Sequence, residues 1–171
     1  MSKFEIRELT TSDWENYKKV RLDSLLDSPD SFCSTYEREA AFSHADWQSR
    51  LKAQPGLNVS FPLLAEIHGE PVGLASGVIW DEEPTVTHVY QMWVMPKARG
   101  MGIAKSLLDR ITMWAESKGC GLMKLSVTTT NGAAVSLYKS AGFAVSGMLE
   151  PLREGAALEI QPMEKKLVNA V

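Results

Sequence analysis

Cysteine, excess charge and long apolar runs are all scarce in this chain of 171 residues. Its two cysteines, Cys33 and Cys120, show no metal-type spacing, so we expect neither a disulfide scaffold nor a metal site. The net charge is only -3, without the basic footprint of a nucleic-acid binder. No apolar run approaches the roughly 18 residues of a membrane span, and the N-terminus does not resemble a signal peptide. These absences predict a cytoplasmic protein that binds neither nucleic acid nor membrane.

The pattern of apolar residues predicts one domain over residues 1–171, because no repeat or linker interrupts the short connections. Seven stretches have the alternating or doubly apolar pattern of strands, namely Lys3–Leu9, Phe61–His68, Val72–Trp80, Val86–Met95, Leu122–Thr128, Phe143–Leu149 and Ala157–Leu167. Four have helical spacing, namely Ser12 up to Pro29, Ser43 to about Pro55, Met101–Lys118 and Asn131–Ala141. The order β-α-α-β-β-β-α-β-α-β-β predicts an α/β fold with a mixed sheet and helices on both faces.

Local signals predict where some of these elements begin and end. Ser12 with Glu15 three residues later forms a capping box for the first helix. Asn131 can cap the last helix, and Gly119 can end the long helix before it. The run Gly69-Glu70-Pro71 predicts a turn, so the strands on either side of it should form a hairpin.

The sharpest signal lies where the strand Val86–Met95 ends. The turn Lys97-Ala98-Arg99-Gly100-Met101-Gly102 leads directly into the long helix, whose first N–H groups lack partners and carry positive potential. Gly100 and Gly102 let a bulky anion approach the backbone, and Lys97 and Arg99 add charge. The turn therefore predicts a phosphate cradle, unless its glycines serve steric needs alone.

Two common phosphate loops are excluded by the residues of this turn. A Walker A loop needs Gly-x-x-x-x-Gly-Lys-Ser/Thr, which the chain lacks. A dinucleotide-binding fingerprint needs a glycine or alanine where Lys105 stands, and it belongs near the start of a βαβ unit. Another kind of phosphate ligand is therefore expected.

Two stretches of the chain resemble the GCN5-related N-acetyltransferase (GNAT) family. Lys97-x-x-Gly100-x-Gly102 is similar to the Arg/Gln-x-x-Gly-x-Gly/Ala acetyl-CoA signature of that family, and the strand ending Trp93-Val94-Met95-Pro96 is similar to the strand before it. The run Asn131-x-x-Ala134-x-x-Leu137-Tyr138-x-x-x-Gly142-Phe143 is similar to a second family motif. The chain departs from the family at Lys97, and it has no carboxylate in 85–95, where many relatives carry a catalytic glutamate. The resemblance implies a mixed, mostly antiparallel sheet.

The resemblance implies acetyl-CoA as co-substrate, with no metal. The backbone N–H groups from Arg99 to Ala104 would hold its pyrophosphate, and the strand Met92–Val94, splayed from Leu122–Thr128, would pair with the pantetheine arm. Asn131 would contact the pantetheine or cap its helix. The implied coenzyme-binding residues are Met92, Trp93, Val94, Lys97, Arg99, Gly100, Met101, Gly102, Ile103, Ala104, Asn131 and Tyr138.

The implied reaction is direct attack of a free amine on the thioester in a ternary complex. Tyr138 occupies the family position of the acid that protonates the leaving thiolate, and a phenol with a pKa of about 10 is protonated at neutral pH. The alternative role of Tyr138 is to pack its ring on the core. The backbone N–H of Val94 would stabilise the oxyanion.

The amine must also lose a proton, and His88 is the only side chain of its strand that titrates near neutral pH. Strand alternation would place four residues on one face, namely His88, Tyr90, Met92 and Val94. A purely structural role for His88 stays open, and so do four rival bases, namely Glu66, Asp81, Glu82 and Glu83. The acidic turn 81–83 either attracts a cationic amine or is simply solvated.

Phe32, Tyr36 and Trp47 lie where relatives build the pocket for the acceptor, a small-molecule or peptide amine. We expect Tyr36→Ala to raise the KM for the acceptor without changing coenzyme binding. The resemblance also suggests a homodimer that pairs through residues Ala157–Leu167.

The sequence thus predicts an acetyl-CoA-dependent N-acetyltransferase. In one alternative the acyl donor differs, or the acceptor is a protein N-terminus. In another, the chain is an acyl-CoA-binding regulatory module that has lost catalysis, which the missing strand carboxylate favours and Tyr138 opposes. A plain structural domain would show no affinity for the coenzyme.

Overall fold

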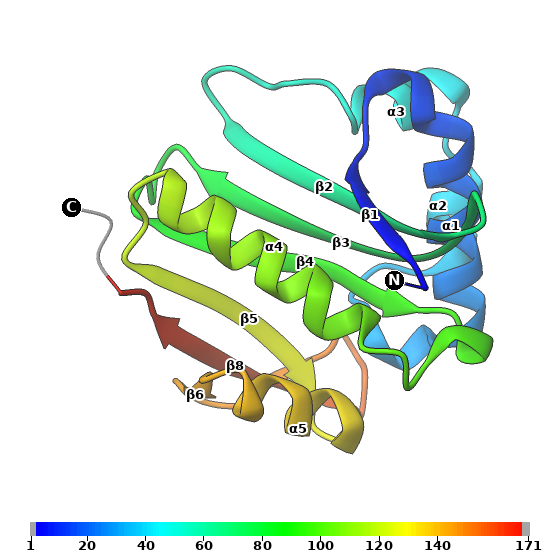
Figure 1. Cartoon of the computed structure of the whole chain (residues 1–171). Helices are drawn as coiled ribbons and strands as arrows, with labels where there is room; N and C mark the ends of the chain where they lie inside the picture. The colour runs from blue at the N-terminus through cyan, green and yellow to red at the C-terminus, as the bar shows by residue number, and fades with distance from the viewer. Residues whose placement is uncertain (1–2, 169–171) are drawn as a thin grey trace.

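An open sheet runs through the middle of the molecule (Figure 1). The computed structural model describes residues 3–168, and its strand order is β1-β2-β3-β4-β5-β8-β6, with β7 also paired to β8. The strands span Glu5–Glu8 (β1), Asn58–Ile67 (β2), Glu70–Trp80 (β3), Val86–Val94 (β4), Leu122–Thr128 (β5), Ala144–Val145 (β6), Glu150–Pro151 (β7) and Glu159–Lys166 (β8). Among the described strands β4 and β5 pair in parallel and the other pairs are antiparallel, which confirms a mixed, mostly antiparallel sheet.

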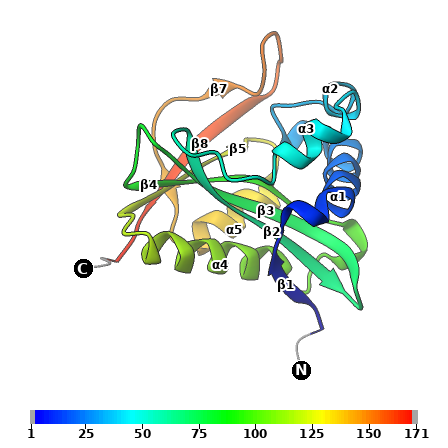
Figure 2. The ribbon, with the colours of Figure 1, turned by 90° about the horizontal axis from the view of Figure 1, so that it is seen from above.

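Helices cover both faces of this sheet, as Figure 2 shows. One face carries α1 (Trp14–Asp27), α2 (Tyr36–Ala40) and α3 (His44–Ser49), and the other carries α4 (Ile103–Ser117) and α5 (Gly132–Ser140). Each face has its own hydrophobic cluster, which we call the α1 cluster and the α4 cluster. Within residues 3–168, no helix has the length and apolar character needed to cross a membrane.

The sequence explains why α4 packs closely on the sheet. Ile103, Leu107 and Ile111 recur at spacings of four, and all three are buried in the α4 cluster. Opposite them, a Cβ on Gly77 of β3 would lie 2.9 Å from Cγ2 of Ile111, so only glycine permits this approach. Burying such aliphatic side chains contributes about 2 kcal/mol each, which fixes α4 and the turn at its start.

The first long helix begins later than its capping signals predict. The expected pair, Ser12 with Glu15, is not the one observed, because a 3-10 turn at Thr11–Asp13 precedes α1. The Asp13 carboxylate accepts a hydrogen bond from the Thr10 N–H at 2.7 Å, so these two residues form the capping box. A further short helix, α2, occupies a stretch where no element was predicted, and α3 ends at residue 49 rather than near 55.

The two C-terminal strands predicted from the sequence are three strands in the structure. Of the stretch predicted as 143–149, only Ala144–Val145 forms a strand, β6, because Gly147 has φ +86° and turns the chain, and β7 follows just beyond the predicted stretch at Glu150–Pro151. The strand predicted over Ala157–Leu167 is β8, which pairs with β5 on one edge and with β6 and β7 on the other. Parts of the edge that the suggested homodimer would use are therefore already paired.

A bulge in β4 corrects the prediction of which side chains share a face. Gln91 has φ +59°, and the pairing with β3 shifts register next to it. The extra residue reverses the alternation beyond it, so Trp93 packs in the α1 cluster. Three side chains of β4 contact the α4 cluster, namely Val89, Met92 and Val94. The prediction that His88, Tyr90, Met92 and Val94 share one face is therefore wrong. Val89, and not His88 or Tyr90, shares the face of Met92 and Val94.

Candidate active site

A gap opens in the sheet between β4 and β5. The two strands pair only from Val86 with Leu122 to His88 with Lys124, and Figure 1 shows them separating toward their carboxyl ends. The N–H of Met95 donates to the carbonyl of Val72 on β3 at 2.7 Å. Because hydrogen bonds alternate along an antiparallel strand, Val94 must point its own N–H away from β3, toward the gap.

The carboxyl end of β4 leads into a turn of unpaired backbone N–H groups. Within residues 3–168, no protein acceptor is assigned to the N–H groups from Gly100 to Lys105, and the first helical bond runs from Ser106 N–H to the carbonyl of Gly102 at 3.0 Å. Gly102 caps α4 without a side-chain hydrogen bond. Gly100 and Gly102 have φ of +81° and +84°, and a Cβ on either would meet no atom within 4 Å. The turn is therefore open to a large anion.

Arg99 does not contribute to this turn in the way predicted. Its N–H donates to the carbonyl of Pro96 at 3.2 Å, so the free donors begin one residue later. Its side chain folds back, with Nε donating to the carbonyl of Val94 at 2.9 Å and Nη2 to Asp27 at 2.7 Å. Asp27, the last residue of α1, also accepts from Nε1 of Trp93 at 3.0 Å. The guanidinium thus braces the end of β4 against α1.

Two charged groups near the turn differ in their surroundings. Burial alone would raise the pKa of Asp27, but hydrogen bonds from Ser28, Trp93 and Arg99 hold it below its ordinary value. Lys97 pairs with Glu70 at 2.8 Å, and both side chains are mostly exposed. A pair of that kind contributes little to stability, so Lys97 can exchange Glu70 for another anion at small cost.

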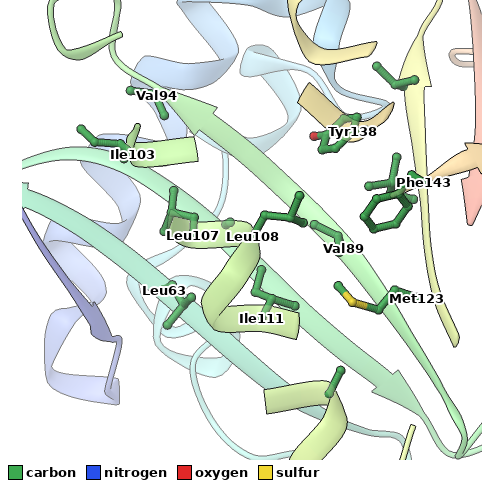
Figure 3. Close-up of a cluster of buried hydrophobic side chains, with 14 of the residues drawn as sticks. Leu63, Val89, Val94, Ile103, Leu107, Leu108, Ile111, Met123, Tyr138 and Phe143 are labelled. Carbon is green, nitrogen blue, oxygen red and sulfur yellow. The ribbon is translucent and has the colours of Figure 1, made fainter. Parts of the chain in front are cut away.

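Tyr138 lies on α5 and faces the gap. Asn131 accepts a hydrogen bond from the Ala134 N–H at 3.2 Å, which confirms the predicted cap of this helix. Tyr138 is buried, and its ring meets the edge of Phe143 with centroids 6.0 Å apart. In Figure 3 its hydroxyl points away from Phe143, toward the side on which β4 lies. Burial raises the pKa of Tyr138 to about 12, so the phenol is protonated at neutral pH and can donate.

A cavity of about 730 Å³ reaches this gap. Its walls come from both strands of the gap, from both hydrophobic clusters and from α1. The predicted site residues among its walls are Phe32, His88, Met92 and Tyr138. Tyr36 does not line it and instead packs against the α1 cluster, so the geometry does not support the predicted contact of Tyr36 with the acceptor.

His88 is held in place at the narrow end of the gap. Its Nε2 lies 2.8 Å from the Glu83 carboxylate, and its ring stacks on Tyr90 with centroids 6.0 Å apart. The hydrogen bond with His88 is the main reason that the pKa of Glu83 is lowered, and the charge of Lys124 adds to it. Glu66, one of the rival bases, instead binds Nε of Arg7 at 2.6 Å and does not line the cavity.

The sequence analysis missed an ionic cluster at another wall of the cavity. Arg21 of α1 donates to both carboxylate oxygens of Glu39, at 3.0 and 2.8 Å, and Arg50 also binds that carboxylate. Burial alone would raise the pKa of Glu39, but the hydrogen bonds and charge of Arg21, with a hydrogen bond from Arg50, lower it to about 2. One signal could have revealed the cluster, because Arg21 lies on the buried stripe of α1, four residues from both Tyr17 and Leu25.

Arg21 also carries an unusual buried atom. Its side chain is only 4% exposed, and its Nη1 has no hydrogen-bond partner among the described residues. The indole nitrogen of Trp47 is the second such atom, but Trp47 does not line the cavity. A buried, unpaired donor costs about 1–3 kcal/mol, so its persistence needs an explanation.

Comparison with known proteins bears on this site. Residues 7–143 match the model of the acetyltransferase (GNAT) family. The chain is 27% identical over 150 residues, 86% of each chain, to the L-amino acid N-acetyltransferase AaaT of Escherichia coli (strain K12). Its fold is similar to yncA from Salmonella typhimurium, whose structure contains its cofactor acetyl-CoA, with TM-score 0.80 and 20% identity over 99% of this chain and 97% of that one. It is also similar to a GNAT-family acetyltransferase from Streptococcus pneumoniae, with TM-score 0.78 and 20% identity over 96% and 99% of the two chains.

Proposed function

Because the chain belongs to the GNAT acetyltransferase family, we propose that it transfers an acetyl group from acetyl-CoA to a primary amine. The observation that supports this most is the cavity that reaches the gap between β4 and β5, together with the turn of free N–H groups at 100–105. The acetyl thioester would supply an activated carbonyl and a thiolate leaving group. The amine nitrogen would attack that carbon directly, so the enzyme needs no nucleophile of its own.

The residues of the turn fit a diphosphate. The turn offers six successive backbone donors and the positive end of α4, which suit a ligand with several anionic oxygens. Its two glycines leave room for that ligand, because a Cβ on either would meet no atom within 4 Å. Lys97 would add a mobile positive charge once it leaves Glu70. The free edge of β4 at Met92–Val94 would pair with an amide-bearing arm, and the side-chain amide nitrogen of Asn131 would add a donor.

Three groups would then act on the reacting atoms. The N–H of Val94 would donate to the developing oxyanion, because it points into the gap. The hydroxyl of Tyr138 would protonate the departing sulfur. His88 would take the proton from the amine at Nδ1. Its Nε2 would keep a hydrogen that it donates to the Glu83 carboxylate, and this bond would fix the tautomer.

An acyl-CoA-binding module without catalysis is the second candidate. No carboxylate lies on the strand between Thr85 and Met95, which favours it. His88 and Tyr138 both line the cavity, which favours an enzyme instead.

Thiol release from acetyl-CoA, measured over a panel of primary amines, tests the proposal. We expect turnover with at least one amine and saturable binding of coenzyme A by calorimetry. Coenzyme binding without turnover on any amine would support the module, and no coenzyme binding would refute both.

The role of His88 has a separate test. We expect His88→Gln to lower kcat/KM about tenfold or more near neutral pH and to flatten the rise of the rate with pH. Glu83→Gln should give a smaller loss of the same kind, and the matched control His44→Gln, at the exposed start of α3, should give none. A pH–rate profile that is identical in His88→Gln and the native protein would rule His88 out as the base.

A further inference from the structure

The unpaired Nη1 of Arg21 is the feature that the proposed reaction leaves unexplained. Arg21 lines the cavity, and Nε and Nη2 of its guanidinium are both satisfied by Glu39. Nη1 is buried without an acceptor among the described residues. Phe32, which also lines the cavity, packs its ring 4.6 Å from the guanidinium carbon. A guanidinium placed in this way can take one more planar anion.

The charges around Arg21 also favour an anion. Two guanidiniums, those of Arg21 and Arg50, share the single carboxylate of Glu39, so one positive charge is left over. Four cationic side chains line the cavity, namely Arg21, Arg50, Lys52 and Lys124, of which Lys124 lies 3.8 Å from Glu83 at the end near His88. Glu150 is the one carboxylate among the described residues that line it. A ligand with only an ammonium group would meet repulsion at this wall.

Arg21 is placed on the same side of β4 as His88. Tyr17, one helical turn earlier on α1, donates its hydroxyl hydrogen to Oε1 of Gln91 at 2.9 Å. This bond fixes the inner stripe of α1 against β4, near the face that carries His88 and Tyr90. His88 and Arg21 therefore line the same cavity, in which an amine and an anionic group of one molecule can be held apart.

We infer that the acceptor carries a carboxylate as well as its amine, and that Arg21 binds this carboxylate through Nη1. The inference rests on the proposed acetyl transfer. The amine lies toward His88 and Glu83, and the carboxylate lies toward Arg21 and Arg50. Because Nη1 is covered in the free protein, the ligand reaches it when a neighbouring side chain shifts. Free amino acids are the smallest molecules that meet this description.

The first experiment compares L-amino acids with their L-amino acid amides as acceptors for the native protein. The amide keeps the side chain and the amine but loses the negative charge, and its amine gives up a proton more readily. Chemical reactivity alone therefore favours the amide. We expect the opposite order, with KM for the amide at least about tenfold above that for the acid. A dipeptide, whose carboxylate lies further from its amine, distinguishes a peptide acceptor from a free amino acid.

The second experiment measures how Arg21 contributes to this preference. In Arg21→Gln the acid-to-amide ratio of kcat/KM should fall about tenfold or more, and the basicity of each amine cancels in the comparison with the native protein. Arg21→Lys keeps a charge beside Glu39 but lacks the third nitrogen, so its ratio should fall as well. The matched control Arg38→Gln, which removes an exposed arginine from the neighbouring helix α2, should leave the ratio unchanged.

The outcomes separate this inference from the proposed function. If amides are acetylated as well as acids, or better, the carboxylate site is refuted while the acetyltransferase stands. If no amine is acetylated, the proposed function fails first. If the Arg21 variants do not fold, binding of acids and amides to the native protein, measured by ligand-detected NMR in the presence of coenzyme A, decides the matter, and equal affinities refute the site.

Discussion

The proposed coenzyme side and the proposed acceptor side of the gap are built from different parts of the chain. On the coenzyme side the donors are main-chain N–H groups from six consecutive residues, 100–105. On the acceptor side the chemistry belongs to side chains from α1, β4 and the segment around Arg50, which lie far apart in the sequence. A main-chain site tolerates changes in its side chains as long as the backbone keeps its path. A side-chain site changes its specificity with single substitutions.

The largest effect is expected at Tyr138, where the two sides meet. Tyr138→Phe removes one hydroxyl from a buried ring, and loss of a general acid lowers kcat about 100-fold or more. Coenzyme affinity should stay within a factor of about three. Stopped-flow or steady-state thiol release measures kcat, and calorimetry measures the affinity for the coenzyme. Full turnover in Tyr138→Phe would leave only the packing role for this residue.

Acid should weaken the acceptor side more than the coenzyme side. The pKa of Glu39 is about 2 in the folded protein, below its ordinary value of 4.5, so its contribution is present above pH 4.5 and is lost as the pH falls toward 2. The expected loss of unfolding free energy is about 3 kcal/mol. Urea titrations at several pH values measure it.

A matched variant assigns this loss to the buried carboxylate. Glu70, paired with Lys97 near the coenzyme turn, is exposed, so Glu70→Gln should show the same acid sensitivity as the native protein. Glu39→Gln should be less stable at neutral pH and lose less on acidification. If the unfolding free energy had the same pH dependence in the native protein, Glu70→Gln and Glu39→Gln, Glu39 would not be the cause of the acid loss.

The main-chain site can be disturbed by one methyl group. Gly102→Ala places a Cβ at a residue with φ +84°, beside the free N–H groups, and should raise the Kd for coenzyme A about tenfold or more. Gly119→Ala is its control, because Gly119 has φ +79° just beyond the other end of α4 and an equally open surrounding. Both variants should lose similar stability, about 1–2 kcal/mol, but only the first should lose coenzyme affinity. Equal coenzyme affinity in the two would place the diphosphate elsewhere.

The smallest effect is expected at Phe32, which lines the cavity, and it is compared with Tyr36, which packs against the α1 cluster instead. Phe32→Ala should raise the acceptor KM several-fold, because Phe32 lines the cavity and contacts Arg21. Tyr36→Ala, from the same segment, should lower the melting temperature without changing KM, because Tyr36 packs outside the cavity. Initial rates over a range of acceptor concentrations measure both. A KM change in Tyr36→Ala alone would restore the prediction made from sequence.

The sequence predicted the local structure of the proposed coenzyme side far better than that of the proposed acceptor side. The turn 97–104, the strand before it and the helix after it could be predicted, because glycine spacing and a 3.6-residue period are local signals. The bulge at Gln91 could not, because no proline or glycine marks it, and it reversed the faces assigned to Met92 and Val94. The pairing of Arg21 with Glu39 joins residues 18 apart, which no local pattern reveals.

Asp27 and Arg21 belong to the same helix, and this has a consequence for ligand binding. Asp27 holds Arg99 and Trp93 beside the coenzyme turn, while Arg21 lines the cavity six residues earlier. A helix is a rigid element, so a shift of its position at one end is transmitted to the other end. Occupancy of either ligand should therefore favour the other by the same factor, and the two substrates should show reciprocal synergy in equilibrium binding.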